Sequence, residues 1–301
     1  MSVPAFLGGY QRPVHAEIAR LLGTGESAVE RAMAYTALAP SKQVRGALVL
    51  LSAELCRGSA AHAVPAAAAI ELVHASSLIL DDLPSMDDAP LRRGRRANHL
   101  EFGEPIAILA AFGLLNLAYG AIARAYEPPL AVAMTSRISD AVGPAGLIGG
   151  QALDLAATRS EPPGEPGERR SPSDLPIDFQ TLERIHRGKT GALFVAAAAC
   201  GALAAGGAAE PIAALSAYAK NLGLAFQIVD DLLDVAGDPA DTGKAVRADA
   251  RKTTFVSFSG VEGARQLAAE LCQTADRALA PFGVKADRLR ELSAFVAARR
   301  I

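Results

Sequence analysis

Two aspartate-rich segments of this chain carry the residue types that bind metal ions. The first is DDLPSMD at residues 81–87, and the second is DDLLD at residues 230–234. Clustered carboxylates repel one another unless a cation neutralises them. Hard oxygen ligands in an open cluster favour Mg²⁺, which shares its coordination shell with water and substrate phosphates. Because basic residues follow each segment, notably Arg92 and Lys244, the pair predicts a metal-bridged diphosphate held between two walls.

The second segment has helical spacing. Gln227, Asp230, Asp231 and Asp234 occupy positions i, i+3, i+4 and i+7, which lie on one face of a helix. The flanking residues are so apolar that this helix is expected to be buried, and buried unpaired carboxylates are costly unless they bind a cation. A solvated acidic stripe is the alternative, but the apolar flanks favour a metal site.

The first segment is less regular because Pro84 interrupts it, so Asp87 is expected on a loop. Asp81 and Asp82 would end an apolar helix that begins near Ala66. Carboxylates at a helix C-terminus meet an unfavourable dipole, which strengthens the prediction of a compensating ion.

A basic run, LRRGRR at residues 91–96, follows the first segment. Arg92 and Arg93 offer planar guanidinium groups suited to phosphate oxygens. Taken alone, the run would be interpreted as a solvated basic loop.

The elements that must position these residues are predicted to be helices. Half of the 301 residues are hydrophobic but only 5% are aromatic, and the long Ala/Leu stretches favour helix over sheet. Apolar residues recur at helical spacing through residues 44–55 and 66–80, and no stretch shows convincing strand alternation. We therefore expect an all-α protein with a single domain spanning residues 1–301.

One segment differs from the rest in composition. Residues 158–178 are rich in Pro, Gly and charge. Because such a segment cannot bury apolar area, we expect a mobile surface loop. A domain linker is the alternative, but an excursion between two helices of one bundle is favoured.

Charge, cysteine and hydropathy patterns narrow the function classes. The net charge of −2 gives no electrostatic reason to expect nucleic acid. Cys56, Cys200 and Cys272 are widely spaced among apolar neighbours, which indicates buried free thiols in a cytoplasmic protein. The apolar runs at residues 106–117 and 192–205 fall below the roughly 18 residues that a spanning helix needs, so no membrane span is expected.

The segment GDPADTGK at residues 237–244 is similar to a P-loop but does not match it. Five residues separate its glycines instead of four, and Ala245 stands where Ser or Thr is needed. An EF-hand interpretation fails as well, because the D-x-D-x-D spacing is absent. Nucleotide hydrolysis is therefore not expected.

Several motifs in register resemble the trans-isoprenyl diphosphate synthase family. DDLPSMDDAPLRR at residues 81–93 and FQIVDDLLDVAGDPADTGK at residues 226–244 resemble its two aspartate-rich motifs. Further matches, in chain order, are KQVR at 42–45, ELVH at 71–74, GGQ at 149–151 with Asp154, and HRGKTG at 186–191. The resemblance extends from about Lys42 to Ala269, and residues 74–117 look most like bacterial geranylgeranyl diphosphate synthases of carotenoid pathways.

The resemblance implies an all-α isoprenoid synthase bundle around a central cavity, with the two acidic clusters facing each other at its mouth. It implies Mg²⁺, with Mn²⁺ as an alternative, held chiefly by Asp81, Asp87 and Asp230. Asp82, Asp231 and Asp234 would support these as direct or water-mediated ligands. Arg92, Lys189 and Lys244 would complete the neutralisation of an allylic diphosphate, whose departure leaves an allylic carbocation.

The second substrate implied by the resemblance is isopentenyl diphosphate. Its expected binding residues are Lys42, Arg45, His74 and Arg93. Thr190, Gln227 and the carbonyl groups near Lys189 would stabilise the carbocation without capturing it. A homodimer is also implied. Gln151 and Asp154 match the family, but the sequence gives them no chemical role.

Product length is expected to be set beneath the first cluster. Ser76 and Ser77 lie one helical turn before Asp81, where a bulky aromatic residue in the family shortens the product. Two small residues favour a C20 product over C15, and Phe112 is a candidate floor against longer products. Leu80 departs from the family, because many relatives carry His at this position.

Three alternatives remain open at this level. A farnesyl diphosphate synthase would stop at C15. A class I terpene cyclase also uses a DDxxD motif, but it normally lacks the isopentenyl-binding cations. A catalytically silent partner subunit of another synthase is disfavoured, because both aspartate clusters and their neighbouring cations are intact.

Overall fold

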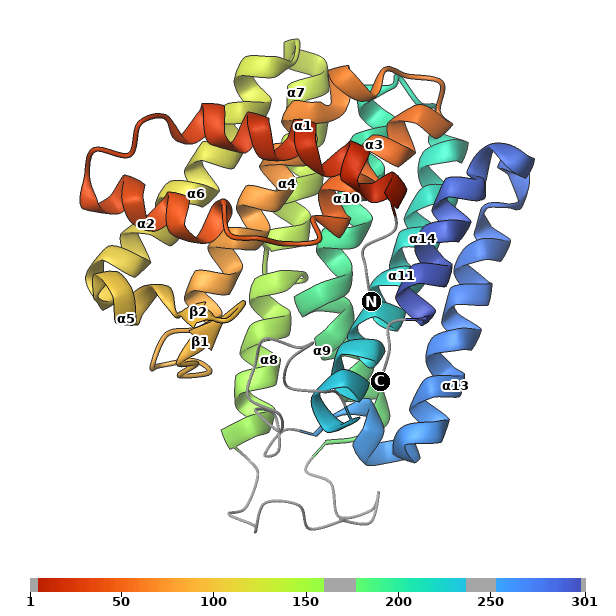
Figure 1. Ribbon diagram of the computed structural model, residues 1–301. Coiled ribbons are helices and arrows are strands. Elements are labelled where there is room, and N and C mark those ends of the chain that lie inside the picture. Colours follow the sequence, from red (N-terminus) through yellow and green to blue (C-terminus); the bar gives the residue numbers. More distant parts are fainter. Residues whose placement is uncertain (1–4, 160–176, 237–252, 299–301) are drawn as a thin grey trace. The chain divides into compact units, whose positions relative to one another are not determined.

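The computed structural model describes residues 5–159, 177–236 and 253–298 (Figure 1). Nearly all of the described elements are helices, which confirms the predicted all-α class. The chain divides into two compact units, whose boundaries fall within helices. The N-terminal unit is Ser2–Ile138 with Ala197–Ile212, and the C-terminal unit comprises Ser139–Ala196 and Ala213–Ile301. A single domain over residues 1–301 stays a prediction.

The central helix of the N-terminal unit is α4 (Ala60–Asp81). It packs against α1 (Ala5–Leu22), α3 (Val44–Leu55) and α6 (Glu104–Ala125), and Figure 1 shows α4 running beside α6. The run of alanines from Ala66 to Ala69 is fully buried, because side chains this small let neighbouring helices approach closely. The remaining helices of this part are α2 (Ala28–Ala37), α5 (Asn98–Phe102) and α7 (Pro128–Val142), the last of which extends past the boundary.

Helix α4 begins earlier than predicted, at Ala60 rather than near Ala66, and therefore contains Pro65. Proline in a helix interior disturbs the hydrogen bonds of the preceding turn. Here the hydroxyl of Tyr126 donates to the carbonyl of His62 (2.8 Å) and accepts from the N–H of Ala66 (3.2 Å). It thus bridges a donor and an acceptor that would normally bond each other. This contact lets the helix continue through the proline.

The basic run forms a short hairpin instead of a plain loop. Strands β1 (Leu91–Arg92) and β2 (Arg95–Arg96) pair antiparallel. Between them, φ is 55° at Arg93 and 73° at Gly94, the pattern of a tight turn with both central residues left-handed. Only this two-stranded element departs from the expectation that no strand would form, among the residues that the structure describes.

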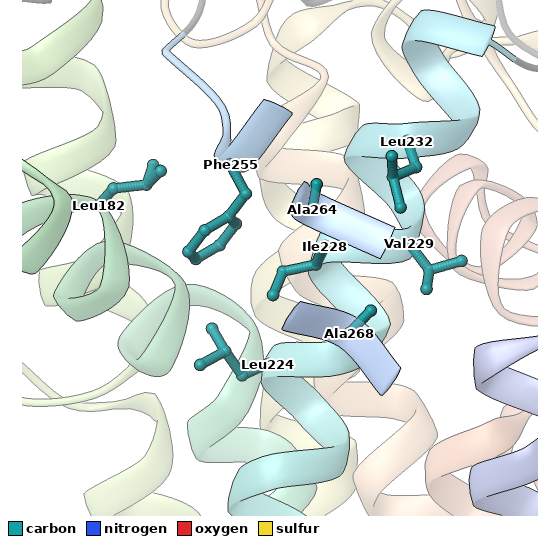
Figure 2. Packing of buried hydrophobic residues seen from close by; sticks show 8 residues of the cluster. All are labelled: Leu182, Leu224, Ile228, Val229, Leu232, Phe255, Ala264 and Ala268. Atoms are coloured by element: carbon teal, nitrogen blue, oxygen red, sulfur yellow. The ribbon is translucent and has the colours of Figure 1, made fainter. Parts of the chain in front are cut away.

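The C-terminal unit contains α8 (Leu147–Arg159), α9 (Phe179–His186), a π-helical turn η2 (Arg187–Gly191) and α13 (Phe255–Ala278). The 3₁₀ segment η3 (Ala280–Ala286) and α14 (Asp287–Ala297) complete it. Helices α10 (Ala192–Ala204) and α11 (Ala209–Ala236) belong to it in part, since a unit boundary falls within each of them. Figure 2 shows its buried apolar cluster, in which the ring of Phe255 lies among Leu182, Leu224 and Ile228.

Part of the predicted loop at residues 158–178 is ordered helix. Helix α8 continues through Arg159, and Asp178 caps the start of α9 by accepting from the N–H of Thr181 (2.7 Å). Residues 160–176 lie outside the described residues, so the loop itself stays a prediction.

Three helices have the length and composition of a membrane span: Ala60–Asp81, Glu104–Ala125 and Ala209–Val235. The sequence argument from short apolar runs was therefore wrong for α6, whose 22 residues extend beyond the run at both ends. Two-thirds of the apolar window of α4 is nonetheless buried inside the protein (67%), as in a core helix.

Among the cysteines, Cys200 and Cys272 are buried as expected, whereas Cys56 is partly exposed.

Candidate active site

The first acidic cluster lies where α4 ends. Asp81 is the last residue of the helix and Asp82 is its C-cap, as predicted. The chain then folds back on itself, so that the N–H of Asp87 donates to the carbonyl of Asp81 (2.9 Å). This turn brings Asp81 and Asp87 together, and both residues are partly exposed.

Asp82, unlike Asp81 and Asp87, is buried and only 2% exposed. Arg92 donates to it with a guanidinium fork: Nε lies 3.0 Å from Oδ1 and 3.1 Å from Oδ2, and a terminal nitrogen also contacts Oδ1. Such charge-assisted, forked pairs are strong and directional. The expectation that Asp82 supports a metal ion is therefore not favoured, because both of its oxygens already accept from Arg92. Arg92 in turn is fixed beside the cluster.

Arg45 and Arg93, two of the predicted isopentenyl-binding residues, lie in the same unit near the buried Glu71, and His74 lies beside Arg45. Nη1 of Arg45 is 3.3 Å from Nε2 of His74. Because arginine can only donate, this ring nitrogen accepts and His74 carries its proton on Nδ1. Burial, together with the charges of Arg45, Arg93 and Arg92, holds the pKa of His74 well below its ordinary value. The ring is therefore neutral near pH 7.

Glu71 was part of a motif match but had no assigned role. It is 7% exposed, and its Oε1 accepts from the N–H of Gly46 (2.7 Å). Burial raises the pKa of Glu71, while that hydrogen bond and the charges of Arg45 and Arg93 oppose the rise. Glu71 thus supplies the negative charge between two of the predicted substrate-binding arginines.

The same contact fixes the start of α3, which carries the predicted Arg45 and follows directly on the predicted Lys42 and its neighbour Gln43. The N-cap residue Gln43 has a left-handed backbone (φ 42°) and makes no side-chain cap to the described residues. Glu71 replaces this cap from the neighbouring helix by accepting the N–H of Gly46. On the other side, Nε2 of Gln11 donates to the carbonyl of Lys42 (2.7 Å).

The three chain-length candidates have different environments. Ser76 is 5% exposed and donates to the carbonyl of Ala111 on α6 (2.9 Å), so it belongs to the α4–α6 contact. Ser77 is partly exposed and lies one turn before Asp81 on the same side of α4. Phe112 is 65% exposed in a stripe on α6 with Ile108 and Leu109. Phe112 therefore closes no cavity within the described subunit, and the floor expected of it is not supported.

In the C-terminal unit, the HRGKTG motif forms the π-helical turn η2, a feature often found at functional sites. Nζ of Lys189 lies 2.7 Å from Oδ2 of Asp154, and both side chains are largely buried. Asp154, which the sequence left without a role, is therefore the partner of the predicted diphosphate-binding lysine. Gly150 permits this approach, because a Cβ there would lie 2.2 Å from the backbone nitrogen of Lys189.

The second acidic cluster lies near the end of α11. Gln227 donates through Nε2 to Oδ1 of Asp231 (2.9 Å), which confirms that the two residues share a helical face. Oε1 of Gln227 accepts from the hydroxyl of Thr190 on η2 (2.8 Å). A close approach at Gly223, where a Cβ would lie 3.1 Å from the Cα of Gly191, brings these elements together.

The aspartates of the second cluster differ in exposure. Asp231 is 7% exposed, and its other oxygen, Oδ2, accepts from the N–H of Phe255 (3.1 Å). Asp230 and Asp234 are partly exposed one helical turn apart. Lys244, the third cation expected at the diphosphate, lies outside the described residues.

Within the described residues, no group of three or more His, Cys, Asp or Glu side chains is arranged to hold a metal ion. Asp81 with Asp87, and Asp230 with Asp234, form two partly exposed pairs, and the buried Asp82 and Asp231 accept hydrogen bonds from Arg92, Gln227 and Phe255. Mg²⁺ is commonly bound by one or two carboxylates that share it with water and phosphate oxygens. The donor set therefore fits Mg²⁺ with a diphosphate better than a closed protein cage.

Comparisons with known proteins identify the class to which this all-α fold and these paired aspartates belong. The polyprenyl synthetase family model matches residues 26–278. The chain belongs to the polyprenyl synthetase family, which confirms the resemblance seen in its motifs, and it is a prenyltransferase.

Its relatives include enzymes of different product length. It is 39% identical over 282 residues to geranylgeranyl pyrophosphate synthase 11, chloroplastic, of Arabidopsis thaliana, covering 90% of this chain and 74% of that protein. It is 42% identical over 258 residues to farnesyl diphosphate synthase of Escherichia coli, covering 83% and 81%. The crystal structure of geranylgeranyl pyrophosphate synthetase from Pyrococcus horikoshii superposes with a TM-score of 0.86 at 28% identity, covering 98% of both chains.

Proposed function

We propose that this prenyltransferase condenses isopentenyl diphosphate with the allylic diphosphates of C5, C10 and C15 chains, and that its main product is the C20 geranylgeranyl diphosphate. The allylic C–O bond breaks, and diphosphate leaves with the electron pair. The double bond of isopentenyl diphosphate forms the new C–C bond with the resulting cation. Loss of a proton, taken up by the released diphosphate, restores a double bond.

The observation that carries this proposal is the arrangement at the end of α4. Asp81 and Asp87 are joined through their backbones, and the Asp82–Arg92 pair holds a cation beside them. We propose Asp81, Asp87, Asp230 and Asp234 as the Mg²⁺ ligands, with Arg92, Lys189 and Lys244 neutralising the diphosphate. Bound Mg²⁺ would stabilise the negative charge of the leaving diphosphate. Mn²⁺ has the same preference for oxygen ligands and is expected to replace it.

Isopentenyl diphosphate is proposed to bind at Lys42, Arg45, His74 and Arg93. Clustering of Arg45 and Arg93 near Glu71, with the neutral His74 beside Arg45, supports this assignment, since two arginines with a single counter-charge attract an anionic diphosphate. His74 would use its Nδ1–H as a hydrogen-bond donor to the diphosphate.

Small residues before Asp81 support the C20 product. Ser77, which shares the side of α4 that carries Asp81, leaves room for a growing chain. Farnesyl diphosphate, C15, is the alternative product, because relatives of both types match the chain at similar identity.

We further propose a cytoplasmic homodimer without a membrane span. The apolar stripe of Ile108, Leu109 and Phe112 on α6 supports pairing with a second copy, since contiguous exposed apolar side chains commonly mark interfaces. In a dimer these residues would be covered. Light scattering of the purified protein would check the mass, and monomers at micromolar concentration would contradict the proposal.

One assay tests the function. The protein is incubated with Mg²⁺, isopentenyl diphosphate and each allylic partner in turn, and the products are sized by chromatography. We expect C20 from every starter. Cyclised hydrocarbon would indicate a terpene cyclase, and inactivity of the folded protein would revive the silent-subunit alternative. Activity that persists in EDTA, or in the double variant Asp81→Ala with Asp230→Ala, would contradict the mechanism.

A further inference from the structure

A chain of hydrogen bonds links η2, α11 and the start of α13 within the C-terminal unit. The hydroxyl of Thr190 lies 2.8 Å from Oε1 of Gln227, Nε2 of Gln227 lies 2.9 Å from Oδ1 of Asp231, and Oδ2 of Asp231 accepts from the backbone N–H of Phe255 at 3.1 Å. Gln227 and Asp231 lie one turn apart on α11, and Thr190 is brought to them from η2.

The direction of every hydrogen bond in this chain follows from the chemistry of Asp231. An ionised carboxylate can only accept, so Gln227 must present its amide N–H₂ to Asp231. The carbonyl oxygen of the amide then faces Thr190. Because that oxygen also can only accept, the hydroxyl of Thr190 must donate its single proton to Gln227.

The orientation of its hydroxyl proton decides whether Thr190 presents a hydrogen-bond donor or acceptor lone pairs to a ligand. A hydroxyl has one donor and two acceptor lone pairs. With the proton committed to Gln227, only lone pairs remain for any other neighbour of Thr190. Lone pairs attract a carbocation, whereas a hydroxyl proton directed at it would repel it.

The second oxygen of Asp231, Oδ2, is fixed by the backbone at the start of α13. Phe255 is the first residue of α13, and its N–H is one of those that a helix leaves without an internal partner. The positive end of the helix dipole favours an ionised carboxylate there. The ring of Phe255 is fully buried in the apolar cluster of Figure 2, which fixes the backbone N–H relative to α11.

We propose that Asp231 is a positioning residue for the prenyl transfer and not a metal ligand: it orients Gln227 and, through it, turns the lone pairs of Thr190 toward the allylic cation. The inference rests on the proposed function, which places Thr190 beside that cation. Two adjacent aspartates of one motif, Asp230 and Asp231, thereby have different roles. Asp230, which is partly exposed, keeps the metal role, whereas Asp231 is 7% exposed with both oxygens bonded to protein donors.

The first test uses the matched neighbours Asp231→Asn and Asp230→Asn. Binding of Mg²⁺ with inorganic pyrophosphate is measured by calorimetry on the full chain. We expect the Kd of Asp231→Asn to stay within about 3-fold of wild type, while that of Asp230→Asn rises by about 10-fold or more because a charged ligand is lost. Equal weakening in the two variants would overturn the inference.

The second test asks whether Asp231 acts through Thr190. In prenyl transfer, Asp231→Asn and Thr190→Val should each lower kcat by about 100-fold with KM nearly unchanged, as for loss of a group that acts in the transition state. The double variant should be no slower than the slower single variant, and Thr190→Ser, which restores the hydroxyl, should recover part of the activity that Thr190→Val loses. Additive losses, or a loss confined to KM, would overturn the proposal that Asp231 acts on Thr190 through Gln227.

If Asp231→Asn does not fold, the same comparison of single and double variants is made with Gln227→Met and Thr190→Val, since Gln227 is the intermediate group. Non-additive losses would support a chain of action through Gln227 to Thr190, and additive losses would overturn it. Failure of the proposed function is distinguishable: wild-type protein would then form no prenyl product, whereas failure of this inference leaves wild-type activity intact.

Discussion

Nζ of Lys189 lies 2.7 Å from Oδ2 of Asp154, although the two residues are 35 positions apart in the sequence. An ammonium group has three donors, so Lys189 can keep this bond and still donate to a diphosphate. Asp154 thereby limits where the ammonium can point. The pair gives the GGQ-x-x-D segment a function that its residue types alone did not indicate.

Replacement of Asp154 by Asn should misplace Lys189. We expect kcat/KM for the allylic diphosphate to fall by about 10-fold, because a largely buried charge loses its partner. The matched control is Glu183→Gln, which breaks the more exposed Arg187–Glu183 pair in the same region and should change kcat/KM little. Steady-state kinetics with varied allylic substrate measure both, and equal effects of the two variants would contradict the assignment.

Replacement of Asp82 should lower the free energy of unfolding more than replacement of Asp81. Asp82→Asn removes the hydrogen-bonded counter-charge of the largely buried Arg92, so the free energy of unfolding should fall by about 3 kcal/mol. Asp81→Asn removes a partly exposed carboxylate and should change it by no more than about 0.5–1 kcal/mol, while weakening the binding of Mg²⁺ with pyrophosphate. Chemical denaturation without metal measures the first effect, and calorimetry measures the second. A stability loss of similar size in both variants would refute the distinction.

Replacement of Glu71 should raise KM for isopentenyl diphosphate more than KM for the allylic substrate. Glu71→Leu removes the substitute cap of α3, so KM for isopentenyl diphosphate should rise by about 10-fold. Glu71→Gln keeps an acceptor oxygen for the N–H of Gly46 and should restore part of the loss. Glu54→Gln, which changes an exposed glutamate on α3 that does not cap the helix start, serves as the control. An unchanged KM in a folded Glu71→Leu variant would show that the cap is not needed.

Product length should respond to Ser77. A phenylalanine there would fill the side of α4 that leads away from Asp81, so the main product should shift from C20 to C15 or shorter. Ser77→Ala, which adds no bulk, should leave the product unchanged. Chromatography of the dephosphorylated alcohols would measure the ratio, and C20 product from Ser77→Phe would place the growing chain elsewhere.

Stability should depend on pH through His74. Its pKa in the folded protein is lowered, chiefly by burial, so on acidification the unfolded chain takes up a proton that the native ring resists. The stability that depends on the neutral ring is therefore complete above pH 6.5 and is lost as pH falls from 6.5 toward the lowered native pKa. A His74→Gln variant should lose less stability than wild type over that window. Identical pH profiles of denaturation would contradict this expectation.

The sequence by itself determined the class of the fold and the identity of the chemistry. Alanine- and leucine-rich segments with helical periodicity could form only helices, and Pro84 forced Asp87 onto a loop, as the structure has it. The i, i+4 spacing likewise placed Gln227 and Asp231 on one helical face, where they are hydrogen-bonded. These features are local, because they depend on backbone preferences within a few residues.

Only the tertiary structure decided which of two adjacent aspartates is partly exposed and which is buried against protein donors. Asp81 and Asp82 are chemically identical, as are Asp230 and Asp231, and the motif resemblance assigned all four to the metal, with Asp82 and Asp231 in supporting roles. Asp82 pairs with Arg92 on the first strand of the hairpin, and Asp231 accepts from the N–H of Phe255 at the start of a helix 24 residues away. Glu71 similarly caps α3 from 25 residues away. Such partners are set by how helices pack, since burial requires each carboxylate to be satisfied by whichever donor the packing supplies.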